Sequence, residues 1–152
     1  MKVFLDANVY FAGFYSPTGA SSVLLELIRL KKLEAFSSRL VLTEAERNLR
    51  LKAKPPILKT FHQFLKEIPL KICPPPAPGE LAKYESFIHP KDVPVLAAAV
   101  AASVDFFITL DRRHFMTSEV LKKITTPKII TPGEYLTDHC CLTRRDSRTG
   151  RA

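Results

Sequence analysis

Four acidic residues stand where a parallel α/β protein usually places its chemistry: Asp6, Glu44, Asp92 and Asp111. Asp6 directly follows the unbroken apolar run Val3–Leu5, which is typical of a strand buried on both faces. Asp111 follows a second apolar strand, and Glu44 and Asp92 stand at expected helix starts. Because strand ends and helix starts share one edge of such a sheet, we expect the four carboxylates to meet in one crevice.

Four carboxylates in one crevice would repel one another and raise one another's pKa values unless divalent cations were bound. We expect no basic residue inside to neutralise them. Oxygen-only ligands favour Mg²⁺ or Mn²⁺. Two such ions about 3.5–4 Å apart could stabilise both the attacking water and the leaving oxygen of a phosphodiester. The residue types therefore indicate a metal site suited to phosphodiester hydrolysis.

Each acid also has a plainer interpretation. Glu44 and Asp92 could be helix-start acids, worth ~0.3–1 kcal/mol through the helix dipole. Asp111 could be a turn former. Asp6 is the hardest to explain in this way, because it interrupts the exit of a core strand.

The hydrophobic pattern predicts an α/β fold, a three-layer α/β/α sandwich around a central parallel sheet. The main strands are expected at Lys2–Leu5, Leu33–Phe36, Phe106–Thr109 and Lys128–Ile130, with a short one at Leu70–Cys73. Helices are expected at Ala20–Lys32, Glu44–Lys52, Ile57–Glu67, Glu80–Ile88, Lys91–Ser103 and Met116–Ile124, and a last turn at Pro132–Leu136.

Residues that cap helices or favour loops indicate where some of these elements begin and end. Ser21 or Ser22 could cap the first helix, and Thr43 with Glu46 could form a capping box for the second. Asn8, Gly13, Pro17 and Gly19 predict a loop with a short aromatic segment between the first strand and the first helix.

The 152 residues predict one domain. The run from Pro74 to Gly79 is an extended connector that we interpret as an internal loop. After Leu136 the apolar period is lost. We therefore predict one folded domain over residues 1–136 and a mobile basic tail over residues 137–152.

The net charge of +8 favours a polyanionic partner such as nucleic acid, although solvated lysine faces alone would also explain it. The three cysteines indicate reduced thiols, hence a cytoplasmic location. No apolar run approaches the ~18 residues of a membrane-spanning helix, and the first residues do not have the pattern of a signal peptide.

Four blocks of the sequence resemble, in order, the signature blocks of the PIN-domain family. They are Leu5–Val9, Thr43–Leu49, Lys91–Ala99 and Phe107–Asp111. The resemblance extends over roughly Lys2 to Leu136. It implies a parallel α/β/α sandwich and metal-dependent ribonuclease activity, and many bacterial and archaeal members are toxins of toxin–antitoxin pairs.

Carried over by position, the resemblance implies that Asp6, Glu44, Asp92 and Asp111 are the catalytic, metal-ligating acids. Asn8 and Thr109 would support them through hydrogen bonds. Glu46 competes with Glu44 for the second position, and we prefer Glu44 because Leu49 closes its block at the spacing of the family.

The leading hypothesis is a Mg²⁺- or Mn²⁺-dependent endoribonuclease, with RNA held by Lys52, Lys54, Arg112 and Arg113. An alternative is a non-catalytic RNA-binding PIN module, which the presence of all four acids disfavours. A phosphatase with Asp6 as nucleophile would usually need a second Asp at position 8, which is Asn8.

The expected protein partners are an antitoxin or a second copy of the chain. Phe11, Phe14 and Tyr15, with the helices from Ala20 and Ile57, offer apolar surface for such contacts. The alternative is that these residues close the core of a monomer.

Overall fold

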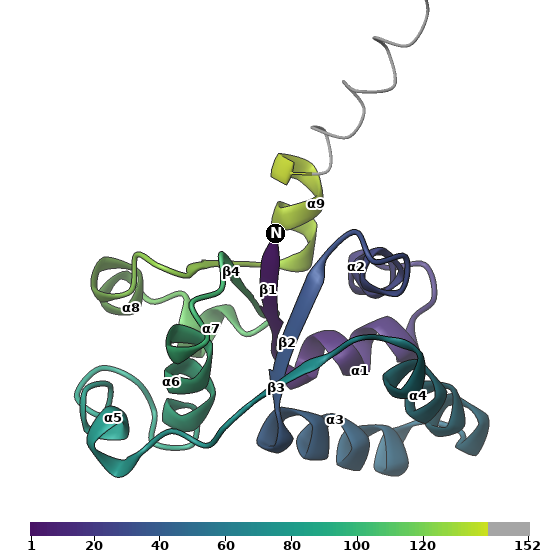
Figure 1. Ribbon diagram of the computed structural model, residues 1–152, viewed down its shortest axis with the longest axis horizontal. Helices are drawn as coiled ribbons and strands as arrows, with labels where there is room; N and C mark the ends of the chain where they lie inside the picture. Colours follow the sequence, from purple (N-terminus) through teal and green to yellow (C-terminus); the bar gives the residue numbers. More distant parts are fainter. Residues whose placement is uncertain (140–152) are drawn as a thin grey trace, which may run out of the picture.

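The computed structural model describes residues 1–139 of the chain (Figure 1). The strands are β1 (Lys2–Leu5), β2 (Glu34–Ser38), β3 (Lys71–Cys73), β4 (Phe106–Ile108) and β5 (Lys128–Ile130). The helices are α1 (Ala7–Tyr15), α2 (Ala20–Arg29), α3 (Arg39–Lys52), α4 (Pro55–Glu67), α5 (Pro78–Ala82), α6 (Val93–Ala101), α7 (Arg112–Phe115), α8 (Ser118–Lys123) and α9 (Pro132–His139).

The five strands form one parallel sheet in the order β3-β2-β1-β4-β5. The order reverses at β1, which pairs with β2 on one side and β4 on the other. The crevice at such a reversal is where open α/β sheets bind ligands, so the carboxyl end of β1 is the expected functional edge.

Helices cover both faces of the sheet, so the predicted three-layer α/β/α fold is confirmed. In Figure 1 the sheet lies between α1, α2 and α4 on one side and α5, α6 and α8 on the other. Val3–Leu5 of β1 and all of β4 are buried, and Phe4 packs edge to face on Phe107 with ring centroids 5.8 Å apart. Within the part of the chain described, no helix is long and apolar enough to cross a membrane.

The segment after β1 was expected to be a loop, and this prediction is wrong. Asp6 caps a helix, α1, by accepting a hydrogen bond from the Ala7 backbone N–H at 2.8 Å. Gly13 is a packing residue of this helix, because an added Cβ would lie 2.3 Å from Leu25 Cδ1 on α2. The glycine thus allows α1 and α2 to approach closely, as can occur at helix–helix contacts.

The N-cap predictions are also wrong. Helix α3 begins at Arg39, and Ser38 caps it by accepting from the Val41 N–H at 3.3 Å, so Thr43 lies inside the helix. Gly19 stands at the N-cap of α2 and offers no side chain to it. Propensity misplaced the start of α3 because β2 runs two residues further than Phe36 and passes directly into α3. Helix α2 begins at Ala20 as predicted, and only its cap differs.

Several other helix and strand boundaries differ from the predicted ones. Helix α5 ends at Ala82 where Ile88 was expected, and α7 was not anticipated. The sheet includes strands on both sides of the proline run, β3 before it and β4 after it. Helix α9 continues to His139, three residues into the predicted tail, and the rest of that tail lies outside the described residues.

Candidate active site

Asp6 lies at the carboxyl end of β1 and is held by three donors. Its Oδ1 accepts from the Ala7 N–H at 2.8 Å, and its Oδ2 accepts from the Thr109 hydroxyl at 2.8 Å and from Asn8 Nδ2 at 3.1 Å. Asn8 in turn accepts at Oδ1 from the Leu110 N–H at 3.0 Å. The supporting contacts that the sequence predicted for Asn8 and Thr109 are therefore present, and they fix the carboxylate of Asp6 in one orientation.

Burial raises the pKa of Asp6 to about 6. The hydrogen bonds from Thr109 and Ala7 oppose this rise, while the nearby carboxylates of Glu44 and Asp92 add to it. Asp6 is only 7% exposed, so its charged form lacks solvation that surface carboxylates have. A carboxylate whose pKa is raised by burial and by neighbouring acids is typical of a functional site.

Asp6 opens into a cleft of about 310 Å³ between the start of α1, the helix α3 and the start of α6. Glu44 contributes from α3 and Asp92 from the N-cap of α6, so three of the four predicted acids line one cleft. Burial raises the pKa of Asp92, with Asp111 adding to the rise and His114 opposing it.

Two basic residues also line this cleft, against our expectation that none would. Arg47 lies one helical turn after Glu44 on α3, and Lys91 directly precedes Asp92. The i, i+3 spacing from Glu44 to Arg47 is a signal that could have placed Arg47 on the same face of α3. The cleft therefore combines carboxylates with cations.

Asp111 is placed differently from the other three acids. It is not among the residues that line the cleft, and it caps α7 by accepting from the His114 N–H at 3.1 Å. Its Oδ2 lies 2.6 Å from His114 Nδ1. Its charge still acts on Asp92, so Asp111 lies at the margin of the acidic group. The contact with His114 was not among the predictions from the sequence.

Glu44 and Glu46 point to different sides of α3. Glu44 lines the cleft, whereas Glu46 pairs with Arg50 at 2.5 Å and lies 3.6 Å from His62. The two-residue spacing on a helix separates them, as the preference for Glu44 assumed.

A family model described as "PIN domain" matches residues 2–113, which is most of the chain and contains all four acids. The chain belongs to the PIN-domain family. The resemblance inferred from the four sequence blocks is thereby confirmed.

Solved structures share this PIN fold at low sequence identity. VapBC2 from Rickettsia felis, bound to a DNA fragment from its promoter, is 19% identical with a TM-score of 0.59, covering 86% of this chain and 97% of that one. FitAcB from Neisseria gonorrhoeae is 17% identical with a TM-score of 0.59, covering 86% and 98%. FitAB bound to the IR36 DNA fragment is 17% identical with a TM-score of 0.56, covering 86% and 94%. A comparison with curated proteins found no match.

The donor set of the PIN cleft suits a hard divalent cation. Asp6, Glu44 and Asp92 offer carboxylate oxygens only, as Mg²⁺ and Mn²⁺ prefer. Among the described residues, no three His, Cys, Asp or Glu side chains already stand close enough together to enclose an ion. The three carboxylates therefore fit a divalent cation chemically. To ligate it together with Asp6, the side chains of Glu44 and Asp92 would have to come closer to Asp6.

The four cations predicted to hold RNA lie outside this cleft. Lys52 Nζ stands 5.6 Å from the ring centroid of Phe11, and Lys54 occupies the N-cap of α4. Arg112 pairs with Glu134 at 2.9 Å, and Arg113 is exposed beside it on α7. Their role toward RNA stays a prediction.

Proposed function

We propose that this PIN domain is a Mg²⁺- or Mn²⁺-dependent endoribonuclease and the toxin of a toxin–antitoxin pair. The observation that carries the proposal is the cleft where Asp6, Glu44 and Asp92 meet beside two cations, Arg47 and Lys91. Phosphodiester hydrolysis needs both features, carboxylates to hold metal ions and cations to hold phosphate.

Each side chain has a role that follows from its place. Asp6, Glu44 and Asp92 would hold the metal ions, with Asp111 joining them from the margin. When bound, these ions supply an activated water and neutralise the charge that develops on the phosphoryl oxygens. Thr109 and Asn8 keep the Asp6 carboxylate in place, and Arg47 and Lys91 are positioned to contact the phosphates that flank the scissile bond.

Cleavage of single-stranded RNA by the wild type and by Asp6→Asn tests this function. We expect cleavage by the wild type with millimolar Mn²⁺ or Mg²⁺, none with a chelator, and none by Asp6→Asn. Mn²⁺ should also raise the Tm of the wild type, because it binds the native state. An RNA-binding module without catalysis would instead bind the RNA and leave it intact under every condition. Full cleavage by Asp6→Asn would contradict the proposal.

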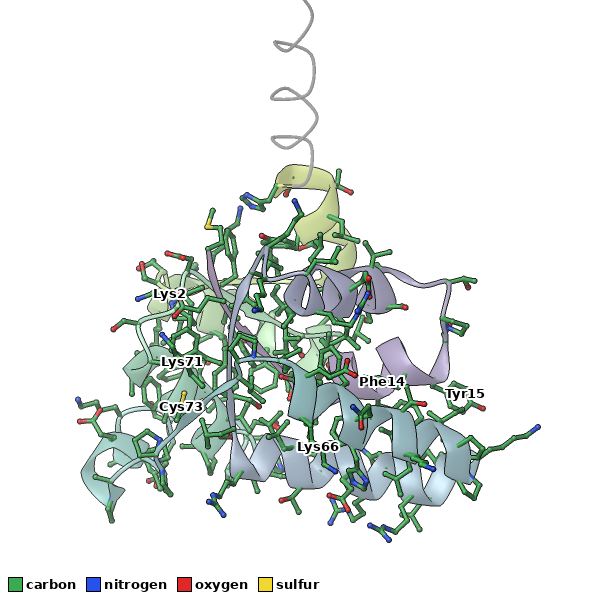
Figure 2. All side chains as sticks on the ribbon, turned by 45° about the vertical axis from the view of Figure 1, so that its right-hand side comes forward. Lys2, Phe14, Tyr15, Lys66, Lys71 and Cys73 are labelled. Carbon is green, nitrogen blue, oxygen red and sulfur yellow. The ribbon has the colours of Figure 1, made fainter. Side chains whose placement is uncertain are left out.

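An antitoxin would find its docking surface near the C-terminal end of α1, away from the acidic cleft at its N-terminal end. A groove of about 780 Å³ lies between α1, α2 and α4, lined by apolar residues such as Phe14, Leu25 and Phe64 with charged residues among them. Phe14 packs inward on Phe61 and Phe64, whereas Tyr15 is 54% exposed at the outer edge of the molecule (Figure 2). The aromatic segment thus serves both the core and the surface.

The same surface could pair two copies of the chain instead. Light scattering on the isolated protein separates the two partners. A dimer would support self-association through this groove. A strict monomer would rule out self-association and leave an antitoxin as the expected occupant of the groove.

A further inference from the structure

A second cleft, of about 320 Å³, adjoins the acidic one. It is lined by Gly19, Ala20 and Ser21 at the start of α2, by Leu110 and Arg112 after β4, and by the segment Thr131–Gly133. Asn8 lines the acidic cleft and Leu110 lines the second, and the two residues are joined by the hydrogen bond from the Leu110 N–H to Asn8 Oδ1 at 3.0 Å. A chain leaving the acidic cleft over this pair would enter the second cleft.

The N-terminus of α2 presents free donors to this second cleft. Helix α2 has 10 residues, and its N-cap, Gly19, offers no side chain to the first turn. No acceptor among the described residues takes the N–H groups of Ala20, Ser21 or Ser22. These donors and the positive end of the helix dipole favour an anion.

Ser21 gives an independent indication of a ligand. The residue is only 5% exposed, lines the second cleft and makes no side-chain hydrogen bond with any described residue. Its Oγ is not among the fully enclosed side-chain atoms without a partner, so the hydroxyl faces open space, which the cleft provides. Because buried hydroxyl groups normally form a hydrogen bond, one without a protein partner indicates that a ligand binds there.

The neighbouring charges also matter. Arg112 lines the second cleft, and its side chain is 66% exposed. One nitrogen of the Arg112 guanidinium donates to Glu134, which leaves its other donors available.

The N-terminus of α9 also borders the second cleft, but its first turn is capped by side chains. Thr131 Oγ1 accepts from the Glu134 N–H at 3.1 Å, and Glu134 accepts from the Thr131 N–H at 3.4 Å. Of these two helix starts, only that of α2 is without a side-chain cap among the described residues.

We infer that the second cleft is a subsite for a backbone phosphate of the RNA, next to the phosphate cleaved in the acidic cleft. The phosphate is held by the first-turn N–H groups of α2, the Ser21 hydroxyl and the Arg112 guanidinium. The subsite rests on the proposed function for the identity of its ligand as RNA. It gives Arg112 a specific place in substrate binding and sets the path of the strand beyond Asn8.

Gly19→Asp tests the subsite without disturbing the fold. An Asp at the N-cap accepts the free N–H groups itself and adds a negative charge where the phosphate would bind. The backbone of Gly19 is extended, and an added Cβ would come no closer than 3.8 Å to Ser16 Oγ. We therefore expect Gly19→Asp to raise the Tm while weakening RNA binding. A purely structural helix start would give the higher Tm alone.

Ala77→Asp is the matched control. Ala77 is the exposed N-cap of α5, has no side-chain cap and lies away from both clefts. Arg112→Gln is paired in the same way with Arg50→Gln, because Arg50 is also an exposed arginine in one ion pair, with Glu46. Neither Ala77 nor Arg50 lines a cleft, so each control makes the same change of charge outside both clefts.

The readouts are the Kd for a fluorescent single-stranded RNA in chelator at several salt concentrations, and KM and kcat with Mn²⁺. Losing one charge-assisted phosphate contact should weaken binding and raise KM roughly tenfold. It should also lower the slope of log Kd against log salt by about 0.7. The controls should stay within about twofold of the wild type, because neither residue lines a cleft and salt screens exposed charges.

The outcomes separate this subsite from the proposed function. Wild-type protein that binds RNA but never cleaves it, with binding weakened in Gly19→Asp and Arg112→Gln, would leave the subsite standing and contradict the nuclease. Cleavage by both variants with the KM of their controls would overturn the subsite and leave the nuclease intact. Absence of any RNA binding by the wild type would overturn the subsite as well.

Discussion

The Thr109 hydroxyl donates to Asp6 Oδ2 at 2.8 Å and thereby joins the ends of two neighbouring strands, β4 and β1. Thr109 Oγ1 also accepts from the Asp111 N–H at 3.0 Å and from Asn8 Nδ2 at 3.3 Å. One hydroxyl therefore links Asp6, Asn8 and Asp111, three residues that the sequence assigned to the site.

Thr109→Val should remove this link at nearly constant volume. The fully buried valine would leave the Asp111 N–H without its acceptor, at a cost of about 1–3 kcal/mol in the free energy of unfolding. The Asn8 amide would keep only its contact with Asp6 Oδ2. RNA cleavage should fall as well, because Asp6 loses one of its orienting donors. Urea unfolding and a cleavage assay measure both effects. Thr60→Val is the control, since exposed Thr60 bonds only the Pro56 carbonyl of its own helix.

The raised pKa of Asp6 predicts a specific pH dependence for the metal-free protein. The pKa rises from 3.8 in the unfolded chain to about 6 in the fold, so between these values the folded state binds more protons. Stability should therefore fall as pH rises from about 4 to about 6, by roughly 3 kcal/mol in total. Asp6→Asn should flatten this window and be at least as stable as the wild type at pH 7. Parallel pH profiles of the two proteins that coincide would contradict the burial of a charged Asp6.

Gly13→Ala tests the close approach of α1 and α2. The new methyl group would meet Leu25 Cδ1 at 2.3 Å and the Ser21 carbonyl oxygen at 3.2 Å. We expect a loss of about 1–3 kcal/mol from overpacking, against a gain of up to about 1 kcal/mol from helix propensity. Thermal unfolding measures the net loss. In the double variant with Leu25→Ala, the total loss should be smaller than the sum of the two single losses, because the smaller side chain makes room for the new methyl group. Losses that simply add would contradict the contact.

The overall architecture could be predicted from the sequence because buried parallel strands are continuous apolar runs. Val3–Leu5 and Phe106–Ile108 lie where the pattern placed them. Helix α1 could not be predicted in this way, because Asn8 and Gly13 are typical loop residues when read locally. Their roles in the helix depend on partners from other parts of the sequence, Thr109 for Asn8 and Leu25 for Gly13.

The candidate site was predictable to a similar degree. Asp6, Glu44 and Asp92 all line the cleft. Asp6 and Asp92 were found because strand ends and helix starts share one edge of the sheet. Glu44 was expected at a helix start but lies inside α3, which begins at Arg39. Lys91 was missed because the sequence shows its charge but not the direction of its side chain. Arg47 was missed although its i, i+3 spacing from Glu44 could have placed it on the same face of α3. The contact between Asp111 and His114 was missed because it depends on the turn into α7, a helix the pattern did not indicate.

His114 should position Asp111 more than it stabilises the fold. His114→Ala removes the ring that lies 2.6 Å from Asp111 Oδ2 but keeps the backbone N–H that Asp111 Oδ1 accepts. We expect kcat to fall several-fold with Mn²⁺, while the Tm changes little because the His114 side chain is 42% exposed. A higher Mn²⁺ concentration required for half-maximal cleavage would assign the loss to ligand positioning. Unchanged kcat and unchanged Mn²⁺ dependence would contradict the role.

The central claim is that the cleft carboxylates, and not merely acids on α3, carry RNA cleavage. Glu44→Gln and Glu46→Gln test it most directly, because the two residues share a helix but only Glu44 lines the cleft. The measurement is the cleavage rate of single-stranded RNA with Mn²⁺, beside the rise in Tm that Mn²⁺ causes. The account predicts that Glu44→Gln loses at least about 100-fold in rate, or ~2.7 kcal/mol, and much of the Tm rise, while Glu46→Gln keeps both. Equal activity of the two variants, or a larger loss in Glu46→Gln, would contradict it.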